Sequence, residues 1–216
     1  MTRVVVFIDY QNTYMRAREA FGDPNTNAFT FGQILPRQLG SLLREKGEAV
    51  DPNRELTEVR VYRGEPDAQR SPTGQAACQR QLRFWEAQAG VTPISRPLHY
   101  RPTAWDGYGK PTAWEAREKG IDVRLAIDMV MGAARDEYDV AVLVSADTDL
   151  VPAVEAVFEM GKRVEVAAWK PDVGWLSRLR VPGRPLWCHM LKRVDFQRVR
   201  DDADYTRPVP GPLAAE

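Results

Sequence analysis

Carboxylate side chains recur in this sequence where apolar runs begin or end, and carboxylates are common ligands of divalent cations. Asp9 follows the apolar run of residues 4–8, and Asp147 and Asp149 come shortly after the run of residues 140–144. Such groups repel one another when close, unless they are protonated or neutralised by a cation. Oxygen ligands without a neighbouring His or Cys favour Mg²⁺ or Mn²⁺ over zinc. An ion of this kind can activate water and stabilise charge developing on a phosphate.

Structural interpretations compete with this chemistry for each residue taken alone. An Asp after a strand often caps a helix or forms a turn, and Asp149 fits that role. Asp122 could simply favour a helix N-terminus. Asn12 and Ser145, close to the acids in sequence, could bind a phosphate or water, or could be turn and capping groups.

The strands and helices that must position these acids are predicted to alternate along the chain. Apolar and β-branched runs predict strands at residues 4–8, 58–62, 91–98, 140–144, 164–168 and 187–191. Helical patterns lie between them, near residues 11–20, 31–46, 73–89, 122–135, 150–160 and 173–180. This alternation predicts an α/β protein with a parallel sheet covered on both faces. Ligands of such sheets bind outside the carboxyl ends of the strands, where Asp9 and Asp147 would lie.

Two stretches break the alternation. Residues 96–115 are rich in Pro, Gly and aromatic residues and predict a long aromatic loop. The tail from residue 201 to 216 is predicted to be disordered, and residues 1–200 are predicted to form one domain. Aromatic and basic side chains of the loop region could stack bases and contact phosphates of a single strand; they are Tyr100, Arg101, Trp105, Tyr108, Lys110, Trp114 and the following Lys119. Alternatively, Trp105 and Trp114 could close over the core.

Composition excludes several classes of protein. The 216 residues are 44% hydrophobic and 28% charged with a formal net charge of zero, as in ordinary globular proteins. No apolar run approaches the roughly 20 residues that span a bilayer, and the apolar run at the N-terminus is too short for a signal peptide. We therefore expect a cytoplasmic protein with no membrane contact. Cys78 and Cys188 are far apart and support neither a disulfide framework nor a zinc site.

Three motifs together resemble one known family. They are FIDYQN at residues 7–12, EKGIDVRLAIDM at 118–129 and LVSADTDLVPAVEAVFEMGKRVEV at 143–166. They are similar to those of the NYN domain in its bacterial LabA-like, or DUF88, branch, and this branch belongs to the PIN-like nuclease superfamily. The resemblance covers most of residues 1–170 and implies a three-layer α/β/α fold with a mainly parallel sheet of about five strands, in the order 3-2-1-4-5.

The same resemblance implies which residues act. The family's acidic residues correspond to Asp9, Asp122, Asp128 and Asp147, and Asp149 also fits the last motif. Its signature asparagine and serine correspond to Asn12 and Ser145. The metal ligands expected from this correspondence are Asp9, Asp128, Asp147 and Asp149, and the residues expected to contact substrate or phosphate are Asn12, Ser145, Lys119, Arg101, Trp105, Tyr108 and Lys110.

Helix geometry leaves the choice between two of these acids open. Asp122 and Asp128 are six residues apart, about 600° of helical rotation, so they cannot share one face of a regular helix. The spacing of Asp128 from Asp147 resembles that of the acid opening the corresponding helix in PIN-like nucleases. We therefore expect Asp128 to face the metal and Asp122 to project from the preceding turn.

The leading hypothesis from the sequence is a Mg²⁺- or Mn²⁺-dependent ribonuclease that hydrolyses phosphodiester bonds of single-stranded or structured RNA. The main alternative is an NYN-fold module that binds RNA or a protein and regulates it with little or no catalysis. An exposed edge strand and the aromatic loop would also permit a homodimer.

Other α/β classes fit the residues after the first strand poorly. A phosphatase of the haloacid dehalogenase type needs Asp-x-Asp there, where this chain has Asp9-Tyr10-Gln11. The same position carries no glycine-rich turn for a dinucleotide. The acids also lack the lysine arrangement of a response regulator.

Overall fold

The structure is a computed structural model that describes residues 1–22 and 28–207. Its helices are α1 (Tyr10–Phe21), α2 (Pro36–Gly47), α3 (Pro72–Glu86), α4 (Ile121–Ala134), α5 (Val151–Glu159) and α6 (Arg193–Val199), with a short 3₁₀ helix η1 (Thr148–Leu150). Its strands are β1 (Thr2–Asp9), β2 (Arg54–Glu65), β3 (Val91–Pro97), β4 (His99–Trp105), β5 (Pro111–Arg117), β6 (Val140–Val144), β7 (Arg163–Trp169) and β8 (Trp187–Leu191).

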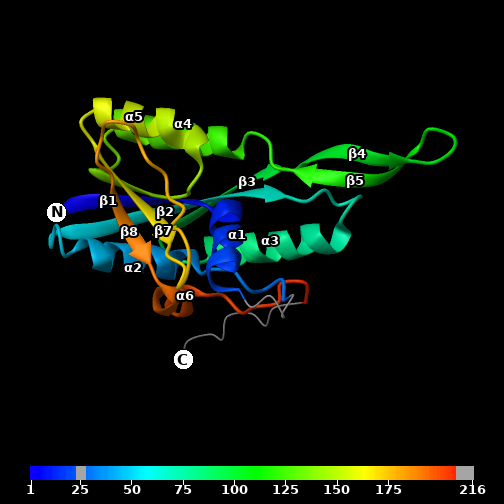
Figure 1. The fold of residues 1–216 in the computed structure, drawn as a ribbon, viewed down its shortest axis with the longest axis horizontal. Coiled ribbons are helices and arrows are strands. Elements are labelled where there is room, and N and C mark those ends of the chain that lie inside the picture. The colour runs from blue at the N-terminus through cyan, green and yellow to red at the C-terminus, as the bar shows by residue number, and fades with distance from the viewer. Residues whose placement is uncertain (23–27, 208–216) are drawn as a thin grey trace.

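A six-stranded parallel sheet forms the centre of the molecule (Figure 1), in the order β3-β2-β1-β6-β7-β8. Every neighbouring pair in it is parallel. This confirms the predicted α/β/α fold and its strand order, with β8 extending the expected five strands to six. Because all strands run the same way, their carboxyl ends share one edge of the sheet, and that edge carries Asp9 at the end of β1.

Each face of the sheet is buried under its own set of helices. Val4, Val6 and Ile8 of β1 pack in a cluster with residues of α1, α2, α3 and α6. Val5 and Phe7, which point to the opposite face because side chains alternate along a strand, pack with residues of α4 and α5. The central strands are therefore apolar on both sides, as expected for a covered parallel sheet.

The segment that was predicted to be a loop is an antiparallel hairpin. Strands β4 and β5 pair from His99↔Arg117 to Trp105↔Pro111 and form a separate two-stranded sheet that projects from the body (Figure 1). Asp106 shapes its turn, because its carboxylate accepts the N–H groups of Tyr108 and Lys110, each at 2.9 Å. Gly109 takes a positive φ of 79° there, which favours glycine.

Two further expectations were wrong. Residues 173–180 form no helix, since Gly174 adopts a φ of 101° and breaks the helical backbone. Residues 201–207 were predicted to be disordered but are packed: Tyr205 is buried and donates to Asp201, and Arg80 donates to the carbonyls of Tyr205 and Thr206. The rest of that predicted tail, residues 208–216, lies outside the described residues.

No helix within residues 1–22 and 28–207 is both long enough and apolar enough to cross a lipid bilayer.

A buried triad of Arg54, Glu165 and His189 joins three strands of the sheet. Arg54 on β2 donates to Glu165 on β7, with one N–O distance of 2.8 Å, and Nε2 of His189 on β8 lies 2.8 Å from the same carboxylate. Burial raises the pKa of Glu165, but the hydrogen bonds from Arg54 and His189 more than offset this, so the pKa lies below its usual range. The Arg54 side chain is completely buried, and its charge depends on this partner.

Replacing Arg54 with Met should lower the free energy of unfolding by about 3 to 5 kcal/mol, because the Glu165 charge would stay buried without the guanidinium that offsets it. Arg3→Met is the matched control: Arg3 pairs with Asp139 and both side chains are 36% exposed, so its loss should be much smaller, because exposed ion pairs contribute little to stability. Urea unfolding followed by tryptophan fluorescence measures both values. Equal losses in the two variants would contradict the role of the triad.

Candidate active site

The carboxyl ends of β1 and β6 are tied together by hydrogen bonds around Asp9. One oxygen of Asp9 accepts the N–H of Asn12 at 3.1 Å and so caps helix α1, and the other accepts the hydroxyl of Ser145 at 3.0 Å. Ser145 also accepts the N–H of Asp147 at 3.1 Å, and Asn12 accepts the N–H of Ala146 at 3.1 Å. These bonds fix Asp9 and the loop after β6 relative to each other.

Five acidic side chains border a cleft of about 300 Å³ at this edge. They are Asp9, Asp147, Asp122 from the first turn of α4, Glu118 in the segment between β5 and α4, and Glu19 of α1, which pairs with Arg16. Gln11, Asn12, Met15 and Arg16 line the rest of the cleft. The sheet brings Asp9 and Asp147 together as predicted from their positions after β1 and β6, and α4 adds Asp122 from the side.

Burial and neighbouring negative charge disfavour the charged forms of Asp9, Asp122 and Glu118. Burial raises the pKa of Asp9 to about 7; the hydrogen bonds from Asn12 and Ser145 oppose this, and the charges of Glu118 and Asp122 add to it. The pKa of Asp122 is also raised, by burial first and then by the charge of Asp147. The pKa of Glu118 is raised mainly by burial. The cleft therefore holds a concentration of negative charge that a bound cation would relieve.

Asp128 does not lie in this cleft, so the expectation that Asp128 rather than Asp122 faces the site was wrong. Asp128 accepts two hydrogen bonds from Arg124, at 2.8 and 2.9 Å, and one from Tyr62 at 3.1 Å. It borders a different hollow with Arg60 and Glu137. The reason is helical phase: α4 begins at Ile121, directly after Gly120, so Asp122 falls in the first turn and points to the sheet edge.

Three other predicted residues, Asp149, Ser145 and Lys119, are not part of the lining of the cleft. Asp149 is exposed. Its backbone N–H donates to the carboxylate of Asp147 at 2.9 Å, so Asp149 is part of the turn beside the cleft. Ser145 is only 3% exposed, and its hydroxyl donates to Asp9 and accepts the N–H of Asp147, so it joins the two acids from below the surface. Lys119 is exposed next to Glu118.

The aromatic and basic residues of the hairpin are on its surface. Trp105 is 57% exposed and Tyr108 is 98% exposed, and Arg101 and Lys110 are exposed as well. Trp114 is 40% exposed and packs on Arg70, whose guanidinium carbon lies 4.4 Å from the ring centroid. Neither tryptophan closes over the core, which removes that alternative.

The donor set in the cleft fits a hard divalent cation, because it offers carboxylate oxygens and neither sulfur nor imidazole. Within the described residues, no group of three His, Cys, Asp or Glu side chains is gathered closely enough to enclose an ion. The acids therefore border the site without forming a closed cage. Such a geometry suits an ion that keeps several water molecules, as Mg²⁺ usually does.

Comparison with known proteins identifies the family of this chain. The family model of the NYN domain matches residues 3–176, so the chain belongs to the NYN domain family, a family of PIN-like nucleases. A solved structure of a protein of unknown function from Vibrio parahaemolyticus aligns with 77% of this chain and 80% of its own length, at 19% identity and a TM-score of 0.45. No curated protein sequence matches the chain.

Glu118 is one of the cleft residues that sequence reasoning missed. Its carboxylate accepts the N–H of Gly64 at 2.6 Å, which holds it at the end of β2. It lies in the same sequence motif as Asp122, directly before Lys119, so its proximity to the acidic motif was the available signal. Nothing in the sequence shows that it turns inward while Lys119 turns outward.

The raised pKa of Asp9 predicts a pH-dependent stability of the metal-free protein. A folded-state pKa of about 7, above the value in the unfolded chain, gives a stabilising contribution that is present below about pH 4 and is lost as the pH rises through 7. Asp9→Asn does not titrate. Between pH 4 and pH 8 the variant should therefore gain on the order of 4 kcal/mol relative to wild type.

Thermal unfolding in EDTA at both pH values measures this difference. Added Mg²⁺ should raise the melting temperature of wild type at pH 8 and have a much smaller effect on Asp9→Asn, because ligand binding stabilises the folded state by mass action. A difference between the two proteins that is the same at pH 4 and pH 8 would show that Asp9 is not desolvated in this way.

Proposed function

We propose that this protein is a divalent-metal-dependent ribonuclease that hydrolyses phosphodiester bonds of RNA at the acidic cleft. The observation that carries the proposal is the convergence of Asp9, Asp122 and Asp147 on one cleft at the carboxyl edge of the sheet. The raised pKa values of Asp9 and Asp122 support it, since perturbed acids grouped in a cleft are typical of functional sites. Membership in the NYN family supports a nucleic acid as the substrate.

The roles of the residues follow from their contacts. Asp9, Asp122 and Asp147 would hold Mg²⁺ or Mn²⁺, directly or through water, and Glu118 would add negative charge beside them. When bound, the ion lowers the pKa of water and offsets charge on the phosphate. Asn12 uses its amide oxygen to accept from Ala146, so its amide N–H groups can donate to a phosphate oxygen. Ser145 keeps Asp9 and Asp147 in position.

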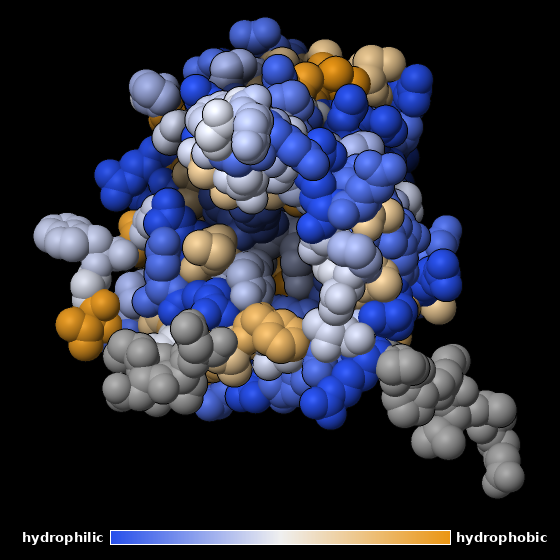
Figure 2. All heavy atoms as spheres, turned by 90° about the vertical axis from the view of Figure 1, so that its right-hand side faces the viewer, coloured by the Kyte–Doolittle hydropathy of each residue, from blue (hydrophilic) through white to orange (hydrophobic). Residues whose placement is uncertain are grey.

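Basic and aromatic groups outside the cleft would hold the strand. Lys119 is exposed beside the cleft and can pair with a phosphate. The hairpin, which projects from the body (Figure 1), carries the exposed residues Arg101, Trp105, Tyr108 and Lys110. Figure 2, which faces the carboxyl edge of the sheet, shows a hollow directly beside this projection. A strand passing from the cleft to the hairpin would meet phosphate-binding and base-stacking groups in turn.

A second candidate function is RNA binding and regulation without cleavage. The open spacing of the acids favours it, since within the described chain they do not close around an ion. The two functions differ in whether the acids are needed for a chemical step, and the substitutions below separate them.

Asp122→Asn and Asp147→Asn should each reduce cleavage of labelled single-stranded RNA in Mg²⁺ or Mn²⁺, because each removes a carboxylate that would hold the ion. The reduction should exceed the roughly 10- to 100-fold that is typical when a residue supporting a metal ligand is lost. Asp128→Asn is the matched control on the same helix as Asp122, and it should cleave at nearly the wild-type rate. Product formation on a denaturing gel, at matched melting temperatures, measures each rate. Loss of activity in Asp128→Asn with full activity in Asp122→Asn would overturn the assignment, and RNA binding without wild-type cleavage in either metal would favour the second function.

Trp105→Ala should weaken RNA binding about 5- to 150-fold, because a base stacked on an aromatic side chain contributes about 1 to 3 kcal/mol. Val50→Ala is the control: Val50 is 60% exposed and precedes the amino end of β2, at the opposite edge of the sheet. Fluorescence anisotropy in EDTA measures binding without cleavage. An unchanged dissociation constant for Trp105→Ala would remove the hairpin from the RNA path.

A further inference from the structure

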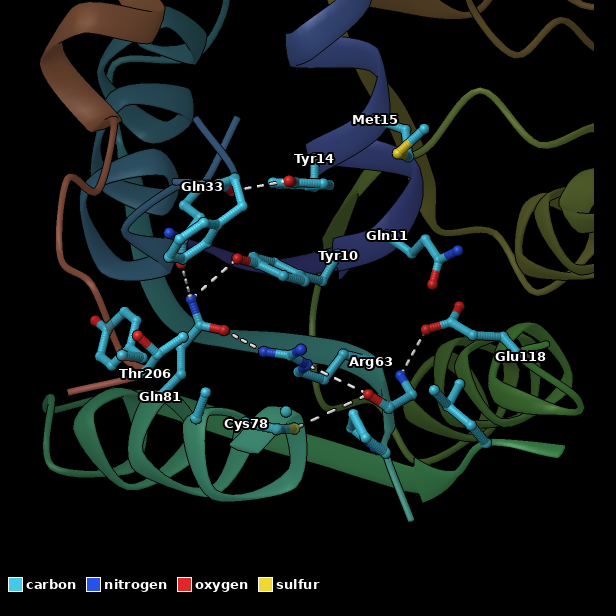
Figure 3. Close-up of a pocket in the computed structure, with 17 residues that line it drawn as sticks. Tyr10, Gln11, Tyr14, Met15, Gln33, Arg63, Cys78, Gln81, Glu118 and Thr206 are labelled. Carbon is cyan, nitrogen blue, oxygen red and sulfur yellow. Dashed lines mark hydrogen bonds between the residues drawn. The ribbon is translucent and has the colours of Figure 1, made fainter. Parts of the chain in front are cut away.

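A second, larger cavity opens beside the acidic cleft. Its volume is about 440 Å³, and it is enclosed by α1, the end of β2, α3 and the segment around Tyr205 (Figure 3). Gln11, Met15 and Glu118 line both this pocket and the acidic cleft. The two spaces are therefore neighbours that share these three side chains as walls. A ligand long enough to pass these side chains would reach the cleft that Asp9 and Asp122 border.

The pocket is built around a hydrogen-bonded polar group formed by Arg63, Gln81, Tyr10 and Gln33. The amide nitrogen of Gln81 donates to the hydroxyl of Tyr10 at 3.0 Å and to the amide oxygen of Gln33 at 2.9 Å. The amide oxygen of Gln81 accepts from Arg63. Gln81 is only 3% exposed and Gln33 only 8%. These contacts fix Arg63 in place (Figure 3).

Arg63 has donor capacity beyond these contacts. A guanidinium carries five N–H groups, and in the described structure Arg63 donates to Gln81 and, weakly at 3.4 Å, to the carbonyl of Gly64. Its guanidinium carbon lies 5.0 Å from the ring centroid of Tyr10 and 5.8 Å from that of Trp85. Packed against these two rings, which contact each other with centroids 4.8 Å apart, it presents its remaining donors with little loss of side-chain entropy.

The walls of the pocket are apolar and partly aromatic. The Tyr10 and Tyr14 rings stack with their centroids 6.3 Å apart, and the other wall residues include Met15, Ala77 and Leu98. A pocket with apolar walls and a few fixed polar groups is typical of small-molecule sites. The ligand that matches is a flat group with hydrogen-bond acceptors on one edge.

We propose that this pocket binds one unpaired nucleobase of the RNA strand, next to the phosphate at the acidic cleft, and that it prefers guanine. Guanine presents two adjacent acceptors, O6 and N7, to which a guanidinium can donate both of its parallel N–H groups. Adenine carries an amino donor in place of O6, which would face the donors of Arg63. This inference rests on the proposed function, because it takes the strand to lie across Asp9 and Asp147.

The preference predicts both affinity and the position of cleavage. In EDTA, a uridine tract that contains one guanine should bind wild type roughly tenfold more tightly than an all-uridine tract or a tract with one adenine. In Mg²⁺ or Mn²⁺, the single guanine should fix the register of the strand, so that the cuts fall at one distance from it. The all-uridine tract should be cut at many positions.

Two variants test whether the pocket causes the preference. Ala77→Phe should fill the pocket from α3 and Arg63→Met should remove the donors, and both should bind the three tracts equally. Ala87→Phe is the matched control, since Ala87 is exposed just after the same helix and lies outside the pocket; it should keep the tenfold preference. The circular dichroism and melting temperature of each variant show whether it is folded.

The possible outcomes separate this inference from the proposed function. Equal binding of the three tracts by wild type, or a preference that survives in folded Ala77→Phe, would overturn the base pocket even if cleavage is strong. A guanine preference in EDTA that Ala77→Phe abolishes would support the pocket even if wild type cuts no RNA, in which case only the nuclease function fails.

Discussion

The hydrogen bonds that join Asp9 to Ser145, and Asn12 to Ala146, are the contacts on which the site depends. They connect the end of β1 with the turn after β6, the two strands at the centre of the sheet. The same carboxylate caps α1, so one side chain sets the start of a helix and the position of a neighbouring loop. Burying a carboxylate costs free energy unless it is well hydrogen-bonded. The raised pKa of Asp9 shows that these bonds offset only part of that cost, and this remainder is what a cation would relieve.

The sequence predicted the parts of the site that depend on strand ends. Asp9 and Asp147 follow apolar runs that are buried on both faces, and parallel strands bring their carboxyl ends to one edge, so their meeting follows from topology alone. The choice between Asp122 and Asp128 depended instead on where α4 begins. If the helix began a few residues earlier or later, different side chains would face the sheet edge. Composition does not determine such a boundary. In the structure α4 begins at Ile121, and with that start Asp122, not Asp128, borders the cleft.

Other features were beyond sequence reasoning because their residues are far apart in the chain. The pocket around Arg63 combines α1, β2, α3 and the segment near Tyr205, and no local pattern predicts that meeting. The hairpin was missed for a different reason. Its strands are exposed along most of their length, so they lack the apolar alternation by which a half-buried strand is recognised, while their Pro and Gly content is typical of loops.

Glu118 connects the hairpin with the acidic cleft. An isolated two-stranded hairpin is marginally stable in water, so β4 and β5 depend on contacts at their base. Tyr100 accepts the N–H of Asp67 at 3.1 Å, and Glu118, directly after β5, accepts the N–H of Gly64. Glu118 also lines both the cleft and the neighbouring pocket. Glu118 thus holds the base of the hairpin and also faces the other acids of the cleft. Neutralising those acids would therefore change the electrostatic environment of Glu118 itself.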